Sequence, residues 1–151
     1  LKPAQLTEAE FTIMKTHVTK GVEMVDAIIG EFDLTELSHT EILRNIVRFH
    51  HERFDGNGYV EGLIGEAIPL EARIVMVADI FDALTSERPY KEAWSVERAI
   101  QFLKDKSGIM LDPSCVSGLI ENRSEIETIK ARFADDEGRE AGFHEAYHSG
   151  I

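Results

Sequence analysis

Apolar residues recur along most of this chain at the three- and four-residue spacing of an amphipathic helix. The spacing predicts helices over about 8–29, 39–50 and 69–84, followed by shorter helices that begin after Ser95 and after the Asp112–Pro113 pair. The stretch 55–65 differs, because four glycines interrupt any helical pattern there and predict a loop. The pattern as a whole predicts an all-α fold.

Helix start signals support these boundaries. Thr7 followed by Glu10 has the form of a capping box, in which each residue satisfies a free polar group of the other. Ser38 followed by Glu41 repeats the pattern, and Gly30 between the two boxes is a typical helix stop. The residues that flank the boxes are apolar and have the spacing of hydrophobic staples: Leu6 with Phe11, and Leu37 with Ile42.

The expected core follows from the same periodicity. In the predicted helix 69–84, one face carries an apolar stripe formed by Ile74, Val77, Ala78 and Phe81. Further along the chain, three apolar residues are expected to close the core: Ile126, Ile129 and Phe133.

Composition narrows the class of protein. A chain of 151 residues with 43% hydrophobic residues is long enough for one domain with a sizeable core, and it has no apolar run that could span a membrane. The net charge of −12 argues against duplex nucleic acid as a partner, since that binding needs clustered Lys and Arg. The single cysteine, Cys115, excludes an internal disulfide and agrees with a reducing compartment, so we expect a cytoplasmic location.

Two adjacent histidines, His50 and His51, end a predicted helix just before the glycine-rich loop. Neighbouring helical residues point about 100° apart, so both reach one metal ion only if the helix frays at this end. The alternative is one exposed and one core histidine. His17 lies on an apolar helix, where a lone histidine is more often structural than a ligand. The remaining histidines are weaker candidates: His39, and the pair His144 and His148 in the polar tail.

Two aspartates lie in the apolar segment RIVMVADIFDAL. Burial of Asp79 is costly unless it is paired, hydrogen-bonded or bound to metal, and Asp82 follows on the same side of the helix. The alternative is a structural aspartate that bonds to loop backbone or to an arginine such as Arg73. The next segment, SERPYK, supplies Arg88 and Lys91, whose charges suit phosphate oxygens but equally suit an exposed surface.

Tyrosines extend this set of candidates. Tyr59 and Tyr90 carry rings that can stack on a purine base. Asn57 and Gly58 precede Tyr59 in a turn whose backbone can approach a ligand closely, although an ordinary Asn-Gly β-turn explains the same residues.

In this order and spacing, the residues resemble the HD-GYP family of cyclic di-GMP phosphodiesterases, a branch of the HD-domain metal phosphohydrolases. The most specific segments are HHERFDGNGYV and GEAIPLEARIVMVADIFDALTSERPYK, and LKPAQLTEAEFTIMKTH is similar to the family's linker and histidine helix. The resemblance implies an HD-domain-like helical bundle over 1–134, followed by a polar C-terminal tail over 135–151.

The resemblance also implies roles for single residues. The metal ligands that it implies are His17, His50, His51 and Asp79, and the family binds two or three ions of iron or manganese. The family hydrolyses cyclic di-GMP to pGpG or GMP, which places His50, His51 and Asp79 at the catalytic centre. The residues expected to contact the substrate are Arg88, Lys91, Asp82 and Tyr59. Asp82 and Arg53 are also expected to support the ligands from outside.

Two departures from the family pattern change this expectation. The chain begins after the place of the family's upstream histidine and His-Asp doublet, so we expect an N-terminally truncated domain whose metal centre lacks several ligands. Val60 stands where the signature turn has proline, which predicts a looser loop and altered contact with partner domains.

The leading hypothesis is the phosphodiesterase output domain of a longer bacterial regulator, with a receiver or sensory domain and a GGDEF-type protein as partners. The alternative is a degenerate domain that binds nucleotide or a protein without hydrolysis. A hydrolase for another nucleotide is a third hypothesis, which the glycine turn and the RPYK segment disfavour. Apolar surface left by missing helices would favour a homodimer.

Overall fold

This computed structural model describes residues 7–34, 39–87 and 92–134, with the backbone alone at 130–131 and 133–134. Within these ranges the regular elements are helices, which confirms the all-α prediction. They are α1 (Glu8–Glu31), α2 (Thr40–Phe49), the 3-10 helix η2 (Gly65–Ala67), α3 (Leu70–Thr85), α4 (Val96–Lys106), α5 (Pro113–Glu121) and α6 (Arg123–Ala134).

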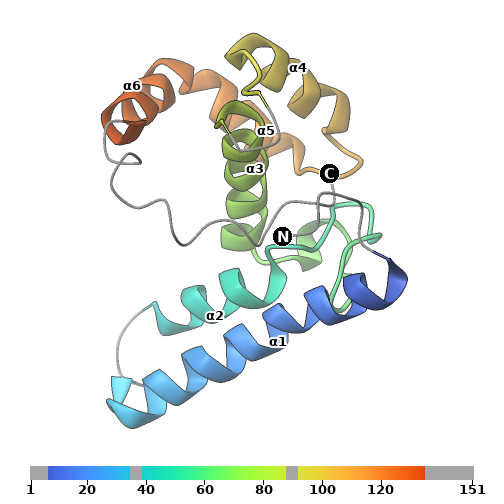
Figure 1. Cartoon of the computed structure of the whole chain (residues 1–151), viewed down its shortest axis with the longest axis vertical. Helices are drawn as coiled ribbons and strands as arrows, with labels where there is room; N and C mark the ends of the chain where they lie inside the picture. The colour runs from blue at the N-terminus through green and yellow to red at the C-terminus, as the bar shows by residue number, and fades with distance from the viewer. Residues whose placement is uncertain (1–6, 35–38, 88–91, 135–151) are drawn as a thin grey trace.

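The helices form two groups that α3 connects (Figure 1). Helices α1 and α2 run antiparallel beside each other at one end of the molecule. Helix α3 packs on α2 and rises across its direction to contact α4 and α5, and α6 packs on α5 at the other end. The histidines of α1 and α2 therefore lie in a different group from the helices α4 to α6.

Local capping fixes most of the helix starts, as the sequence predicts. In the capping box of α1, the Glu10 N–H donates to Thr7 Oγ1 at 3.3 Å and the Thr7 N–H donates to Glu10 Oε2 at 2.7 Å. Ser95 and Asp112 likewise accept backbone N–H groups in the first turns of α4 and α5. The staple residue Leu6 lies outside the described residues.

The start of α2 differs from the prediction. The helix begins at Thr40, and its cap residue is His39, which has a φ of 90° and makes no side-chain cap hydrogen bond. Ser38 and Leu37, the predicted cap and staple, lie outside the described residues. Helix α1 passes through the predicted stop at Gly30 and ends one residue later, because a helical glycine alone does not end a helix whose next residues still bond.

The main core lies where α3, α4 and α5 meet. Its buried side chains are Met76, Val77, Ile80, Phe81, Leu84, Ala99, Ile100, Leu103, Leu111 and Val116. The predicted stripe of α3 is correct for Val77 and Phe81 but wrong for Ile74, which is 51% exposed, and for Ala78, which is also exposed. The helix instead turns Met76, Ile80 and Leu84 inward, because its partners α4 and α5 lie on that side.

The end of the helical region contributes less to the core than expected. Ile126 packs against the core, but Ile129 is 49% exposed, so the prediction for that residue is wrong. The side chain of Phe133 lies outside the described atoms. No described helix combines the length and apolar character that a membrane crossing needs.

Helices α1 and α2 pack closely but bury little. Val18 and Ile29 are the buried residues of α1, and α2 has none. The two helices approach each other at Gly21, where an added Cβ would lie 2.8 Å from Val47 Cγ1. This close approach places the middle of α1 directly against the last turns of α2.

Candidate metal centre

Three histidines meet where α1 lies against the end of α2. His17 comes from α1, His50 is the C-cap residue of α2, and His51 follows it. One ring nitrogen from each lies within 4.8 Å of the other two. His17 Nε2 and His51 Nε2 are 3.1 Å apart although the residues are 34 positions apart in the chain. The structure therefore brings together three of the four predicted metal ligands.

Adjacent histidines can share this site because α2 ends at Phe49, immediately before them. The Glu52 N–H donates to the Phe49 carbonyl at 2.9 Å, an i to i+3 bond that tightens the chain after the last helical residue. As a result the His50 and His51 ring centroids are 4.1 Å apart rather than on separate faces. The helix does not fray at this end but stops at Phe49 in a hydrogen-bonded turn, and both rings are partly buried.

Backbone carbonyls lie against ring nitrogens of His17 and His50. His17 Nδ1 lies 2.6 Å from the Met14 carbonyl, and His50 Nδ1 lies 2.9 Å from that of Ile46 and 3.0 Å from that of Val47. A carbonyl only accepts, so Nδ1 carries a proton in both rings, and in the neutral imidazole Nε2 then keeps its lone pair. Metal-ligating histidines are commonly held in this way.

Burial lowers the pKa of His50, and the charge of His17 acts in the same direction. Hydrogen bonds to backbone carbonyls and the charge of Asp79 oppose this shift without reversing it. His50 is therefore neutral at physiological pH, which is the form that binds a metal ion.

Asp79 lies beside this cluster on α3 and is partly buried. Its charge acts on His50, but among the described residues no carboxylate joins the three histidine nitrogens within 4.8 Å. Arg73, the alternative partner for Asp79, pairs with Asp112 and donates to the Ile68 carbonyl at 2.9 Å. The ligand role of Asp79 stays a prediction.

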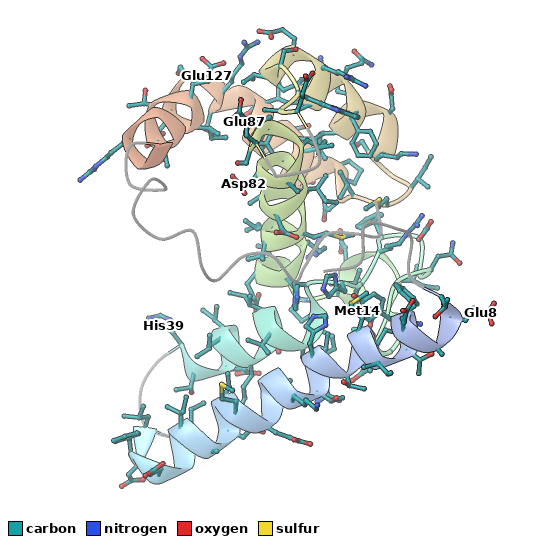
Figure 2. The ribbon with its side chains drawn as sticks, viewed as in Figure 1. Glu8, Met14, His39, Asp82, Glu87 and Glu127 are labelled. Atoms are coloured by element: carbon teal, nitrogen blue, oxygen red, sulfur yellow. The ribbon has the colours of Figure 1, made fainter. Side chains whose placement is uncertain are left out.

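The other predicted site residues lie elsewhere. Asp82 is exposed one turn further along α3, where it accepts a hydrogen bond from the Ser86 hydroxyl at 3.0 Å. Figure 2 shows Asp82 well away from Met14, which marks the histidine cluster, and shows His39 at the opposite end of α2. Several candidates fall outside the described residues: Arg88, Tyr90, Lys91, His144 and His148.

The Tyr59 ring packs against the histidine cluster. Its ring stacks on His51 with centroids 4.7 Å apart and an interplanar angle of 23°. It meets the Phe11 ring edge-on at 5.9 Å, and its hydroxyl donates to Met14 Sδ at 3.7 Å. The peptide bond from Tyr59 to Val60 is cis. Contact of Tyr59 with a purine stays a prediction.

Glu52 is a residue of this region that sequence reasoning missed. Its side chain is 1% exposed, and its carboxylate accepts three backbone hydrogen bonds from the returning loop. The donors are the N–H groups of Glu61 at 2.6 Å, Gly62 at 3.1 Å and Leu63 at 3.0 Å. The only signal in the sequence was a carboxylate directly after the paired histidines.

The turn before Tyr59 is held by a second carboxylate, Asp55. It pairs with Arg53 at 2.8 Å and accepts the Asn57 N–H at 3.0 Å. Burial alone would raise the pKa of Asp55, but the bonds from Arg53 and Asn57 outweigh it and lower the pKa to about 2. Arg53 thus bonds within the loop, and its support of the metal ligands stays a prediction.

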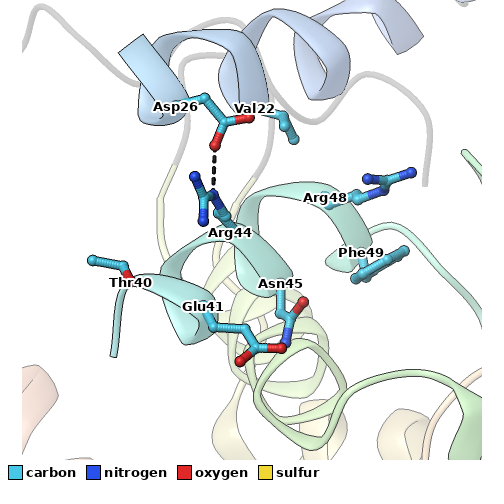
Figure 3. A pocket seen from close by; sticks show the side chains of 8 residues that line it. All are labelled: Val22, Asp26, Thr40, Glu41, Arg44, Asn45, Arg48 and Phe49. Atoms are coloured by element: carbon cyan, nitrogen blue, oxygen red, sulfur yellow. Dashed lines mark hydrogen bonds and ion pairs between the residues drawn. The ribbon is translucent and has the colours of Figure 1, made fainter. Parts of the chain in front are cut away.

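A hollow of about 560 Å³ lies further along the α1–α2 pair, away from the histidines. Figure 3 shows its lining, in which Arg44 bonds to Asp26 at 2.5 Å. A second lining arginine, Arg48, bonds to Glu61 of the loop at 2.7 Å. Because both guanidinium groups already face carboxylates, this hollow is not suited to an anionic ligand.

Comparison with known proteins now identifies the family. A family model described as HD domain matches residues 1–115. The chain therefore belongs to the HD-domain family, as a domain of the HD-GYP type.

Two curated relatives and one solved structure define the resemblance further. The cyclic di-GMP phosphodiesterase response regulator RpfG of Xanthomonas campestris is 45% identical over 92% of this chain and 35% of its own length. A cyclic di-GMP phosphodiesterase of Vibrio cholerae is 40% identical over 89% of this chain and 27% of its own length. The crystal structure of a cyclic GMP-AMP-specific phosphodiesterase of V. cholerae aligns with a TM-score of 0.60 and 26% identity, over 79% of this chain and 25% of that one. The chain thus spans about a third or less of the length of these proteins.

Proposed function

We propose that this chain forms part of a metal-dependent phosphodiesterase that hydrolyses cyclic di-GMP to pGpG or GMP. The observation that carries the proposal is the histidine cluster, in which three imidazole nitrogens from two helices lie within 4.8 Å of one another. The substrate is supported by relatives that are named cyclic di-GMP phosphodiesterases and are 45% and 40% identical to this chain.

The donor set fits a transition-metal ion. Mixed sets of imidazole and carboxylate ligands suit iron, manganese and zinc. Carbonyl contacts at Nδ1 of His17 and His50 leave Nε2 of each ring available to a metal ion. A bound ion would lower the pKa of a coordinated water and stabilise charge on phosphoryl oxygens. We propose His17, His50, His51 and Asp79 as ligands and iron or manganese as the metal. The electrostatic effect of Asp79 on His50 supports its inclusion.

A dianionic substrate needs local cations on a protein with a net charge of −12. Lys15 supplies one beside the cluster, since its ammonium lies 5.3 Å from the ring centroid of Tyr59 and 4.7 Å from that of Phe11. We propose that Lys15 attracts a phosphate, together with Arg88 and Lys91 of the SERPYK segment. Asp82 is the weakest of the expected substrate contacts, because it is exposed and faces Ser86.

We further propose that the domain acts within a longer bacterial signalling protein. The support is that one relative is named a response regulator and that this chain covers 35% of it. A receiver or sensory domain, a GGDEF-type protein and a second copy of the chain remain the partners that we propose for it.

The alternative of a domain that binds nucleotide without hydrolysis also has one supporting observation. Among the described residues, the cluster within 4.8 Å contains histidines and no carboxylate.

A second question is which bases the substrate carries, because relatives that are 34% and 36% identical are named 3'3'-cGAMP-specific phosphodiesterases.

The test is turnover of cyclic di-GMP by the protein loaded with iron or manganese in the absence of oxygen, followed by chromatography of the products. We expect His51→Ala to lose metal by elemental analysis and to reduce activity to that of the metal-free protein. The matched control is His39→Asn, which removes an exposed histidine and keeps a residue type that tolerates a positive φ. We expect the control to retain metal and activity.

Each outcome has a meaning. Full activity in His51→Ala would contradict the metal centre. Tight binding of cyclic di-GMP by the metal-loaded protein without product would favour the non-hydrolytic alternative. Faster turnover of 3'3'-cGAMP than of cyclic di-GMP would keep the reaction and change the substrate.

A further inference from the structure

We propose that Glu52 is a positioning residue, which holds the Tyr59 ring against His51 and so fixes the orientation of His51 in the metal centre. The proposal deepens the proposed function and rests on it for the activity measurement. Its structural and metal-binding measurements are independent of the reaction.

The first part of the argument is the set of bonds to Glu52. A carboxylate that is 1% exposed is costly to bury unless it is fully hydrogen-bonded. Three consecutive backbone N–H groups, those of residues 61 to 63, satisfy it at 2.6, 3.1 and 3.0 Å. These charge-assisted bonds attach residues 61–63, at the end of the loop, to the residue that follows His51.

The second part is the close approach on the other side of the same turn. The Tyr59 N–H donates to the His51 carbonyl at 3.2 Å. Gly58 lies so close to the chain that an added Cβ would be 2.3 Å from the Arg53 nitrogen and 2.5 Å from Glu52 Cα. Residues 58 and 59 therefore lie directly on the 51–53 backbone. The hydrogen bonds from residues 61–63 to Glu52 hold the next part of the loop to the same segment.

The third part is the position of the Tyr59 ring between the two elements that carry the histidines. One face stacks on His51, while the ring edge and hydroxyl contact Phe11 and Met14 of α1, the helix that carries His17. The stacked tyrosine ring covers one face of the His51 imidazole and so limits the orientations that this imidazole can take. Loss of the Glu52 hydrogen bonds would free this ring, while the carbonyl contacts of His17 and His50 would stay in place.

The decisive variant is Glu52→Gln, which keeps the size of the side chain and removes its charge and one acceptor. In the metal-free protein we expect the ring protons of His51 to lose the upfield shift that a stacked aromatic ring produces in the NMR spectrum. We expect metal affinity and kcat to fall about 10- to 100-fold, as for other residues that orient metal ligands, with KM for cyclic di-GMP little changed.

The matched control is Asp112→Asn. Asp112 is the other buried carboxylate among the described residues, 5% exposed, and accepts two backbone N–H groups at the start of α5. Its loss also removes the charge of a buried, hydrogen-bonded carboxylate, but one whose partners are Arg73 and the first turn of α5. We expect Asp112→Asn to lower stability while the His51 resonances, metal affinity and kcat stay at the wild-type values.

Tyr59→Ala provides a second test if Glu52→Gln does not fold, because it removes the ring and leaves the Glu52 bonds in place. We expect the same fall in metal affinity. Wild-type His51 shifts and metal affinity in Glu52→Gln, or wild-type metal affinity in Tyr59→Ala, would overturn the proposal. A wild-type protein that binds metal but does not hydrolyse cyclic di-GMP would contradict the proposed function and leave the role of Glu52 to be decided by these two measurements.

Discussion

Glu52, Asp55 and Asp79 surround one histidine cluster, yet each carboxylate has different partners. Glu52 binds three backbone N–H groups, Asp55 binds a guanidinium and a turn, and Asp79 acts on His50 through its charge. The partners decide the role of each acid, and burial alone does not.

The low pKa of Asp55 predicts a pH-dependent contribution to stability. Its folded pKa is about 2 and its ordinary value is 3.8, so the unfolded chain takes up a proton at a higher pH than the folded one. The contribution is therefore complete above the ordinary pKa and is lost as the pH falls through about 2. We expect Asp55→Asn to reduce the free energy of unfolding more at pH 7 than at pH 3, as measured by urea titration. A difference that is the same at both pH values would contradict the Arg53 and Asn57 pairing.

At the scale of elements, the loop that follows His51 is shaped by glycines as much as by carboxylates. Gly56 has a φ of 78°, a conformation that a β-carbon disfavours, and Gly58 is required by the close approach of two backbone segments. The loop is thus an ordered part of the site and not a spacer between helices.

Replacement of Gly58 tests this role. Because the nearest atoms to an added Cβ are backbone atoms at 2.3 to 2.7 Å, Gly58→Ala must displace the chain, and we expect a loss of about 1–3 kcal/mol or more in the free energy of unfolding. Gly118→Ala is the matched control, since Gly118 lies within α5 and a Cβ there meets nothing within 4 Å. We expect the control to stabilise the protein by about 0.4–1 kcal/mol in urea unfolding. Equal effects of the two changes would contradict the observed loop packing.

Helix boundaries were predictable where the signal was local. Thr7, Ser95 and Asp112 bond to backbone within their own first turns, so sequence spacing alone located them. The face that α3 buries was predicted less well, because the helix is apolar on more than one side. Ile74 and Ala78 are exposed since the packing partners α4 and α5 contact another side of the helix, which no periodicity within α3 could indicate.

In the candidate site, too, local features were predictable from the sequence and contacts between distant segments were not. The pairing of His50 with His51 depends on where α2 ends, and the adjacent glycine-rich loop made that end predictable. The approach of His17 depends on how α1 packs against α2, so the family resemblance and not the spacing located it. Glu52 was missed because its donors are nine to eleven residues away in an irregular loop, where no pattern of the sequence shows which backbone groups turn inward.

At the scale of the whole molecule, α3 joins a loosely buried pair of helices to a well-buried core. Helices α1 and α2 carry the histidines, while the core side chains belong to α3, α4 and α5 and the segment between them. Most of the buried core and the proposed metal centre therefore lie in different parts of the chain.

Core truncation tests this separation. Leu103 is fully buried, so we expect Leu103→Ala to lower the free energy of unfolding by about 2–5 kcal/mol. Under conditions where the variant stays folded, we expect its metal affinity to equal that of the wild type. Ile109→Ala, at a residue that is 53% exposed, is the control and should change stability by about 0.5 kcal/mol or less. A metal affinity that falls with stability in Leu103→Ala would show that the two groups are coupled.

Gly21 sets how closely α1 and α2 approach each other beside the histidines. It lies one turn after His17, and a single added carbon would lie 2.8 Å from Val47 Cγ1 on the facing helix. A larger residue at this position would widen the gap between the helices and, with it, the distance from His17 to the paired histidines, because a stiff valine cannot move aside cheaply. In the proposed metal centre, the absence of one methyl group would therefore limit the ionic radius that the three imidazoles can share, and the choice of metal would depend on interhelical distance as well as on ligand chemistry.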